Sequence, residues 1–272
     1  MPRANSICRE TSRAMIQLRL AATALLAGIA LAACGPTEDG QLAACGGNDA
    51  PAAAQTGGVL SIQPLQFTCK KLENGLRVYA MPDANTASVS VAVWYDVGSK
   101  DDPQGRSGFA HLFEHLMFKS TTNMPPETFD RLTEDAGGFN NASTWNDFTN
   151  YYESVPANHL ERVLWGEAER MGSLVIDDAN FKSERDVVKE EFRQSILSNP
   201  YGKLLGLYLY QSGFNVHPYG RPGIGSIEDL DAATVEDVRA FHAAYYRPAN
   251  AILVVSGNFT EAQLDGCVKK YF

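Results

Sequence analysis

A nearly apolar stretch, Gly108–Phe118, constrains this chain more than any other, because a helix of that composition is buried on most sides. Its only polar side chains with metal-binding capacity belong to His111, Glu114 and His115. On a helix that turns about 100° per residue, these three fall within one sector. Two imidazoles one turn apart can hold a single cation, and the carboxylate beside them is a candidate proton acceptor. The pattern favours a metal site over a core helix with hydrogen-bonded histidines.

A third ligand is predicted on a second helix, 180–197, because a catalytic zinc usually has three protein ligands. The face centred on Glu184 also holds Val187, Val188, Glu191 and Ser195. A carboxylate on a buried apolar face is costly unless it meets a cation or hydrogen-bond donors. A zinc ion on the two histidines would satisfy Glu191, and Glu184 could orient a ligand. Glu190 falls on the wet side and is interpreted as a solvated surface charge.

Residues 1–33 are typical of an export signal, with basic residues followed by an apolar run too short to span a bilayer. The run ends in Leu-Ala-Ala-Cys, which resembles a bacterial lipobox in which Cys34 becomes the lipidated first residue. An ordinary signal peptide with a chance cysteine is the alternative. The residue after Cys34 is Gly35, and a residue other than Asp at this position resembles lipoproteins sent to the outer membrane. We expect a lipid-anchored protein of the bacterial cell envelope, on the periplasmic face of the outer membrane.

Residues 34–59 are rich in Gly, Ala and Pro without periodicity and predict a flexible tether, so the folded domain is expected at 60–272. The formal charge of −9 argues against nucleic acid as a partner. Removal of the signal and acylation of Cys34 would leave Cys45, Cys69 and Cys267, an odd set. A Cys69–Cys267 disulfide is left open.

The order of the predicted elements favours an α+β fold over a doubly wound sheet. Strands are predicted at 76–81 and 88–97, as a hairpin or adjacent pair, and again at 139–144 and 148–155. Helices then dominate, with one late strand at 251–255. The strand 139–144 is polar, which fits either a solvated edge strand or a template on which an extended peptide adds as another strand.

The motif His111-Leu112-Phe113-Glu114-His115, with Glu184 and Glu191 seven residues apart further on, resembles the inverzincins. These are the pitrilysin-type zinc peptidases that include the mitochondrial processing peptidase and insulin-degrading enzyme. The resemblance runs from about residue 72 to 272. It also includes Gly137-Gly138, Asn141-Ala142-Ser143-Thr144, Tyr151-Tyr152, His217-Pro218-Tyr219-Gly220 and Tyr246-Arg247-Pro248-Ala249-Asn250.

The resemblance implies a zinc endopeptidase acting on peptides or unfolded polypeptides, with one Zn²⁺ per chain. Its ligands would be His111, His115 and Glu191, with Glu114 as the general base and Glu184 as a supporting carboxylate. The substrate backbone would pair with the edge strand at Asn141, Ala142 and Thr144. His217 is common in the family but is given no ligand role. The implied fold is a two-layer, mixed and largely antiparallel sheet packed against helices.

Length is the departure from the family, whose members resemble a shell of at least two related halves of about 200 residues each. The sequence contains one half, so a second half in cis or in trans is expected as a partner, beside the peptide substrate and the membrane. Two alternatives remain. One is a non-catalytic pitrilysin-like scaffold or an inactive fragment that needs a second half, and the other is a lipoprotein that stores metal. The complete set of ligands and base favours the enzyme.

Overall fold

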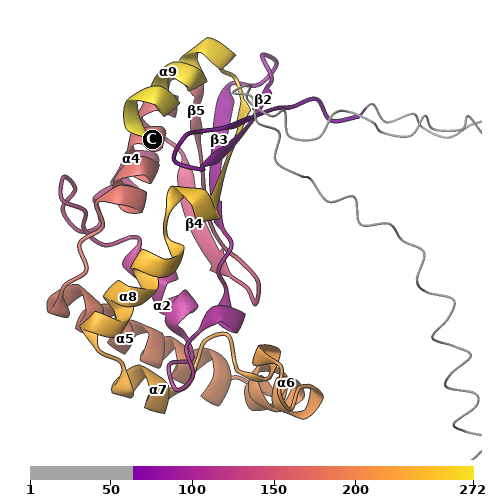
Figure 1. Ribbon diagram of the computed structural model, residues 1–272, viewed down its shortest axis with the longest axis vertical. Coiled ribbons are helices and arrows are strands. Elements are labelled where there is room, and N and C mark those ends of the chain that lie inside the picture. Colours follow the sequence, from indigo (N-terminus) through magenta and orange to yellow (C-terminus); the bar gives the residue numbers. More distant parts are fainter. Residues whose placement is uncertain (1–63) are drawn as a thin grey trace, which may run out of the picture. The chain divides into compact units, whose positions relative to one another are not determined.

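A six-stranded sheet with helices packed on one face forms the centre of the computed structural model, which describes residues 64–272 (Figure 1). The strands are β1 (Thr68–Lys71), β2 (Arg77–Pro82), β3 (Ser88–Tyr95), β4 (Phe139–Thr144), β5 (Thr149–Pro156) and β6 (Ala251–Gly257). Their order is β1-β2-β6-β3-β5-β4. Every neighbouring pair is antiparallel except β2 and β6. The predicted two-layer α+β fold is confirmed.

The late strand β6 lies in the middle of the sheet, so the predicted hairpin or adjacent pair of β2 and β3 is wrong. β6 runs parallel to β2 on one side and antiparallel to β3 on the other. It begins with the unbroken apolar run Ala-Ile-Leu-Val-Val, which suits a strand enclosed between neighbours. A parallel pairing needs a long crossover, and here the connection from β2 to β6 contains three other strands of the sheet and the helices before β6.

The alternation of side chains along β3 explains why the helices gather on one face. Val89, Val91, Val93 and Tyr95 are fully buried, whereas Ser90 and Trp94 on the opposite face are exposed. Successive side chains of a strand point to opposite faces, so the buried set marks the side that the helices cover. The polar strand β4 lies at one edge of this sheet, as its sequence predicts.

Most of the described helices lie between β5 and β6, as predicted. The described helices are α2 (Phe109–Leu116), α3 (Thr128–Glu134), α4 (Leu160–Gly172), α5 (Asp178–Phe192), α6 (Leu209–Gly213), α7 (Ile227–Ala232), α8 (Val235–Tyr245) and α9 (Glu261–Tyr271). Short turns are η1 (Ser99–Asp101), η2 (Ala157–His159), η5 (Pro218–Gly220) and η6 (Pro248–Asn250). The sequence did not reveal β1 or α7. Within residues 64–272, no helix has the length and apolar character needed to cross a membrane.

A second departure follows α5: the helix predicted at 180–197 ends at Phe192, and two π-helical turns come after it, η3 (Arg193–Leu197) and η4 (Leu204–Tyr208). The segment from η3 to α6, residues 193–213, is here called the arm. Its large apolar side chains are exposed: Leu197, Tyr201, Leu204, Leu205, Tyr208, Leu209 and Tyr210. An apolar surface of this extent is uncommon on a self-contained monomer.

The cysteines settle one open question. Cys267 has a free thiol, whereas Cys69 is disulfide-bonded, so these two do not pair with each other. The predicted signal, the tether, Cys34 and the start of the folded domain at residue 60 lie outside the described residues.

Candidate metal centre

The helix α2 places two histidines at the surface of the core. Its apolar residues Phe109, Ala110, Leu112, Phe113 and Leu116 are buried, so the helix is anchored on several sides. The opposite sector carries His111, Glu114 and His115, all partly buried. Periodicity alone predicted this division, because residues three and four apart share a helix face.

The third side chain comes from α5. The N-cap of this helix is Asp177, and its carboxylate accepts a hydrogen bond from the Asn180 N–H. The buried stripe of α5 consists of Phe181, Glu184, Val188 and Phe192. Glu191 lies beside this stripe with 39% of its side chain exposed, and Val187 is exposed, so the prediction that both lie within the buried face is wrong. The margin of the stripe faces α2, which places Glu191 toward the histidines.

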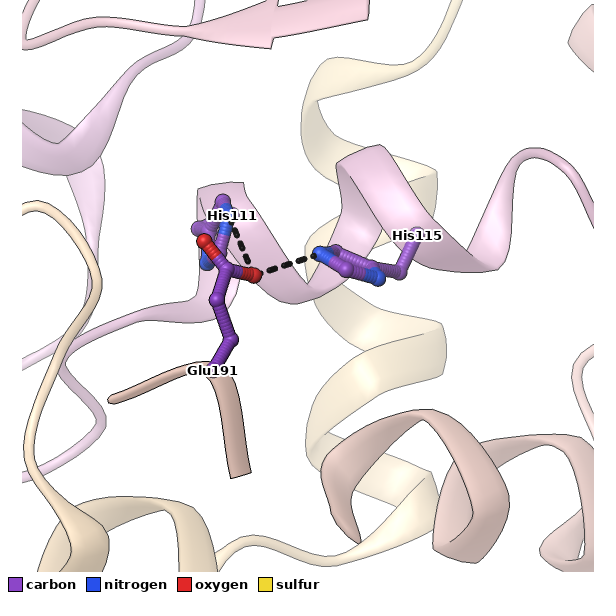
Figure 2. Close-up of side chains that lie close together, drawn as sticks. All are labelled: His111, His115 and Glu191. Carbon is purple, nitrogen blue, oxygen red and sulfur yellow. Dashed lines mark ion pairs between the residues drawn. The ribbon is translucent and has the colours of Figure 1, made fainter. Parts of the chain in front are cut away.

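The side chains of His111, His115 and Glu191 converge. Figure 2 shows the Glu191 carboxylate between the two imidazoles. Glu191 Oε2 lies 3.6 Å from His111 Nε2 and 3.3 Å from His115 Nε2. One potential ligand atom from each residue lies within 4.8 Å of the others. The structure therefore brings the three predicted ligands together from two helices that are distant in sequence.

The electrostatics of this group suit a cation. Burial lowers the pKa of His111 to about 4, so its imidazole is neutral and has a lone pair to donate. Burial also opposes the charged form of His115, but the hydrogen bond and charge of Glu191, together with the charges of Glu114 and Glu184, outweigh burial and raise the pKa of His115. The hydrogen bond between His115 and Glu191 lowers the pKa of the Glu191 carboxyl. Two imidazoles and a carboxylate form the donor set that fits Zn²⁺ with an open position.

Glu114 is held by the edge strand. The Thr144 hydroxyl donates to Glu114 Oε2 at 2.6 Å, and this contact joins β4 to α2. Burial raises the pKa of the Glu114 carboxyl. A carboxyl whose pKa moves toward neutrality is a better proton acceptor and donor in turnover. The sequence predicted Thr144 only as part of a peptide-pairing strand, and its link to the base was missed.

Glu184 is buried and lies between His115 of α2 and Lys119, which follows α2 in the chain. Its Oε2 is 3.8 Å from His115 Nδ1, and its Oε1 is 2.8 Å from Lys119 Nζ. The predicted supporting position is therefore occupied, with Lys119 as an additional partner. Lys119 lies one turn beyond His115, a spacing from which the sequence could have identified it.

The edge of β4 is partly capped by its own side chain. The Ala142 N–H donates to Asn141 Oδ1 at 2.8 Å rather than to β5. An incoming strand would replace this contact with a backbone carbonyl. Asn141, Ala142 and Thr144 thus lie on the sheet edge beside Glu114.

The remaining histidines serve the fold. His217 Nδ1 accepts a hydrogen bond from the Tyr219 N–H, and His242 stacks on Phe113 and Tyr246. His159 ends the turn η2. None of the three belongs to the converging group within residues 64–272. Glu190 forms an exposed ion pair with Arg193 at 3.2 Å, as a surface charge does.

Residues 77–226 match the family model described as insulinase, peptidase family M16, and residues 232–272 match the model described as the peptidase M16 inactive domain. The chain is 39% identical to the zinc protease PqqE of Helicobacter pylori over 202 aligned residues. The alignment covers 74% of this chain and 45% of that protein. The chain is 26% identical over 201 residues to a probable mitochondrial-processing peptidase subunit beta of Arabidopsis thaliana, with 74% and 38% covered.

Solved structures agree. The crystal structure of a protease from Helicobacter pylori superposes with a TM-score of 0.73 at 38% identity, covering 76% of this chain and 50% of that chain. Pitrilysin gives a TM-score of 0.69 at 23% identity, with 76% and 22% covered, a likeness of fold alone. The fold is that of the M16 peptidase domains. The chain belongs to the peptidase family M16, and the resemblance to the pitrilysin-type zinc peptidases is confirmed. It spans under half the length of the two curated relatives named above.

Proposed function

We propose that this chain is the zinc-binding half of an endopeptidase that hydrolyses peptides or unfolded polypeptides. One observation carries the proposal: His111, His115 and Glu191 converge beside a carboxylate, Glu114, that is itself joined to a free sheet edge. Ligands, base and a template for an extended peptide thus occupy one place. A structural zinc site would instead be closed by four protein ligands.

The chain's own residues would divide the work as follows. His111, His115 and Glu191 would hold zinc, which when bound lowers the pKa of a water molecule and polarises a carbonyl. Glu114 takes the proton of the attacking water and returns it to the departing amine. Thr144 keeps the Glu114 carboxylate in place through the 2.6 Å hydrogen bond.

The edge strand would bind the substrate backbone. A peptide that adds to β4 exchanges main-chain hydrogen bonds with little regard for its sequence. The Ala142 N–H is the donor whose present partner, Asn141 Oδ1, a substrate carbonyl would replace. An extended, unfolded segment can meet this requirement, whereas a folded protein surface cannot.

A second M16-type half, in cis or in trans, is the proposed partner. The alignments cover 45% of the zinc protease PqqE and 38% of the processing peptidase subunit, so more than half of each relative lies outside the match, which is consistent with a second half. The arm exposes a group of large apolar side chains, which is consistent with a protein surface covering it. Donors to the transition-state oxyanion would come from that half, and each missing donor costs roughly 10²–10³-fold in rate.

The substitution Glu114→Gln tests the proposal. In the longest natural form of the protein that contains this chain, peptide cleavage should fall by about 10²-fold or more while zinc binding persists. Glu190→Gln is the matched control, because Glu190 is an exposed carboxylate beside a ligand on α5. Equal cleavage by Glu114→Gln and the parent would refute the base. Zinc binding without cleavage in the parent would favour the scaffold alternative.

Export and lipid anchoring at Cys34 form a separate part of the proposal, supported by the lipobox-like sequence. Cys34→Ser should release the protein from the membrane fraction and remove the mass of the acyl groups. Membrane association that survives Cys34→Ser would contradict the anchor. An unlipidated mature N-terminus in the parent would contradict it as well.

A further inference from the structure

The helix α2 begins without a cap from its own first residue. Gly108 occupies the N-cap with φ of 93° and provides no side-chain hydrogen bond. The first N–H groups of a helix have no partner within the helix and need one from elsewhere. In α2 that partner comes from Asp102, six residues before Gly108. Asp102 Oδ2 accepts the Gly108 N–H at 2.7 Å, and Oδ1 accepts the Ala110 N–H at 2.9 Å.

Asp102 is itself fixed by a second group. Asp102 directly follows η1, and only 4% of the residue is exposed. Arg221, from the loop that follows η5, donates from Nη1 to the Asp102 carbonyl at 2.7 Å and from Nη2 to the Lys100 carbonyl at 2.9 Å. The guanidinium therefore clamps the backbone on which the Asp102 carboxylate stands.

The opposite side of the helix start is fixed by close backbone contact. A Cβ atom on Gly108 would lie 2.7 Å from the Ile224 carbonyl oxygen, so the two segments pack without space for a side chain. Its positive φ also favours glycine there. The start of α2 is thus held between Asp102 and the segment around Ile224.

The metal centre depends on this placement. His111 directly follows Ala110, whose N–H Asp102 holds, and His115 lies one turn later. Glu191 comes from another helix and is partly exposed, so the two histidines meet it only if α2 has the correct position and rotation. We propose that Asp102 is a positioning residue of the metal centre: its carboxylate fixes the first turn of α2 so that His111 and His115 face Glu191. This inference rests on the function proposed above.

The cost of this arrangement supports a role beyond stability. Burial raises the pKa of the Asp102 carboxyl to about 7, against the lowering effect of its two backbone hydrogen bonds. A buried carboxylate is an expensive way to satisfy two N–H groups, which a neutral side chain would cap at less cost in desolvation. Its two oxygens, however, hold two N–H groups of the first turn in a fixed relation.

Asp102→Asn tests the proposal, because asparagine has the same shape but only one accepting oxygen. The zinc affinity of the chain, measured by competition with a chromogenic zinc chelator, should weaken by about tenfold or more. The melting temperature of the zinc-free protein should fall moderately, because one N–H of the first turn loses its acceptor. A cap that served stability alone would lower the melting temperature in the same way but leave the zinc affinity of the folded protein at the parental value. Asp101→Asn is the matched control, since the Asp101 carboxylate accepts the Gly98 N–H and not the Gly108 or Ala110 N–H at the start of α2.

Three outcomes are informative. Zinc binding by Asp102→Asn as tight as in the parent would overturn the inference. Failure of the parent itself to bind zinc would instead overturn the proposed function. If Asp102→Asn does not fold, Arg221→Gln decides, because it leaves the carboxylate in place and loosens its backbone; parental zinc affinity in that variant would overturn the inference.

Discussion

Two groups of carboxylates lie on the helical side of the sheet, and they differ in how their charge is balanced. Glu153 on β5 and Glu167 on α4 lie beside Arg170, and these three side chains are 0–1% exposed. Glu184 and Glu191 on α5 lie beside histidines, and the Glu191 and His115 side chains are 39% and 23% exposed. We refer to the first set as the sealed cluster and to the second as the open cluster.

The sealed cluster contains its own cation. Arg170 donates from Nε to Glu167 Oε2 at 2.8 Å and from Nη2 to Glu167 Oε1, so the pair is bidentate. The guanidinium also stacks over Phe129 and Tyr151, with 3.9 and 4.6 Å to the ring centroids. Such a cluster has no capacity for a ligand from solvent. Its contribution is to join α4 to the core behind α2.

The open cluster lacks an equivalent cation. Within residues 64–272 the one ammonium group paired with it is Lys119, which contacts Glu184 and not Glu191. Glu191 instead faces two imidazoles, which balance its charge only when protonated. The comparison teaches that buried carboxylates alone do not mark a site. The missing positive charge, together with access from solvent, distinguishes a metal centre from a structural ion pair.

The largest expected effect comes from removing the cation of the sealed cluster. Arg170→Met should lower the free energy of unfolding by about 3–5 kcal/mol, because it leaves the buried Glu167 carboxylate without its cation. Urea unfolding followed by circular dichroism measures the loss. Arg162→Met on the same helix is the control, since the hydrogen bond from Arg162 to the Arg131 carbonyl is exposed, and it should cost under about 1 kcal/mol. Equal losses for both variants would contradict the sealed cluster's role.

Adding a cation to the open cluster should have the next largest effect, in the opposite direction. Zinc at about 100 times its dissociation constant should raise the free energy of unfolding by about 2.7 kcal/mol, because it binds the folded state. The gain should disappear in His115→Ala. Mg²⁺, which prefers oxygen ligands, should produce little change and serves as the control. Equal stabilisation of the parent and His115→Ala would mean that zinc binds elsewhere.

A smaller effect is expected from the supporting carboxylate of the open cluster. Glu184→Gln should weaken zinc binding by about 10–100-fold, because Glu184 Oε2 faces His115 Nδ1 at 3.8 Å and orients that ring. Isothermal titration with zinc measures the change. Glu190→Gln, on the exposed side of the same helix, should bind zinc like the parent. A parental affinity in Glu184→Gln would restrict the role of Glu184 to its ion pair with Lys119.

The two clusters also show what the sequence can predict. The common face of His111, Glu114 and His115 follows from helical periodicity, which is a local property. The stripe of α5 was predicted too wide, because periodicity cannot show that Glu191 sits at a margin open to solvent. The sealed cluster was missed, since Glu153 looks like an ordinary charge on a strand and its pairing with α4 is decided by tertiary packing.

Long-range pairing set a further limit. β6 is distant in sequence from β2 and β3 but pairs with both of them. Nothing in the local sequence of β2 or β3 predicts that a later strand lies between them. The role of Asp102 was also not predictable from local sequence. The side chain that caps a helix normally belongs to the N-cap residue, whereas Asp102 accepts the Gly108 N–H from across a loop. Composition and turn signals therefore predicted most of the elements and the polar strand β4, but not the order in which the strands pair.

Glu153→Gln should have the smallest effect near pH 5 and tests whether the sealed cluster is neutral as a whole. Burial raises the pKa of Glu153 well above its ordinary value of 4.5, since Arg170 is already paired with Glu167. The folded protein therefore binds a proton that the unfolded chain releases above about pH 4.5, and the parent loses stability as the pH rises. Glutamine does not titrate. The variant should differ from the parent by less than about 1 kcal/mol near pH 5 and gain on it toward about pH 8 in urea unfolding. A difference that stays constant from about pH 5 to about pH 8 would show that Glu153 is ionised throughout, and the sealed cluster would then carry an unbalanced charge.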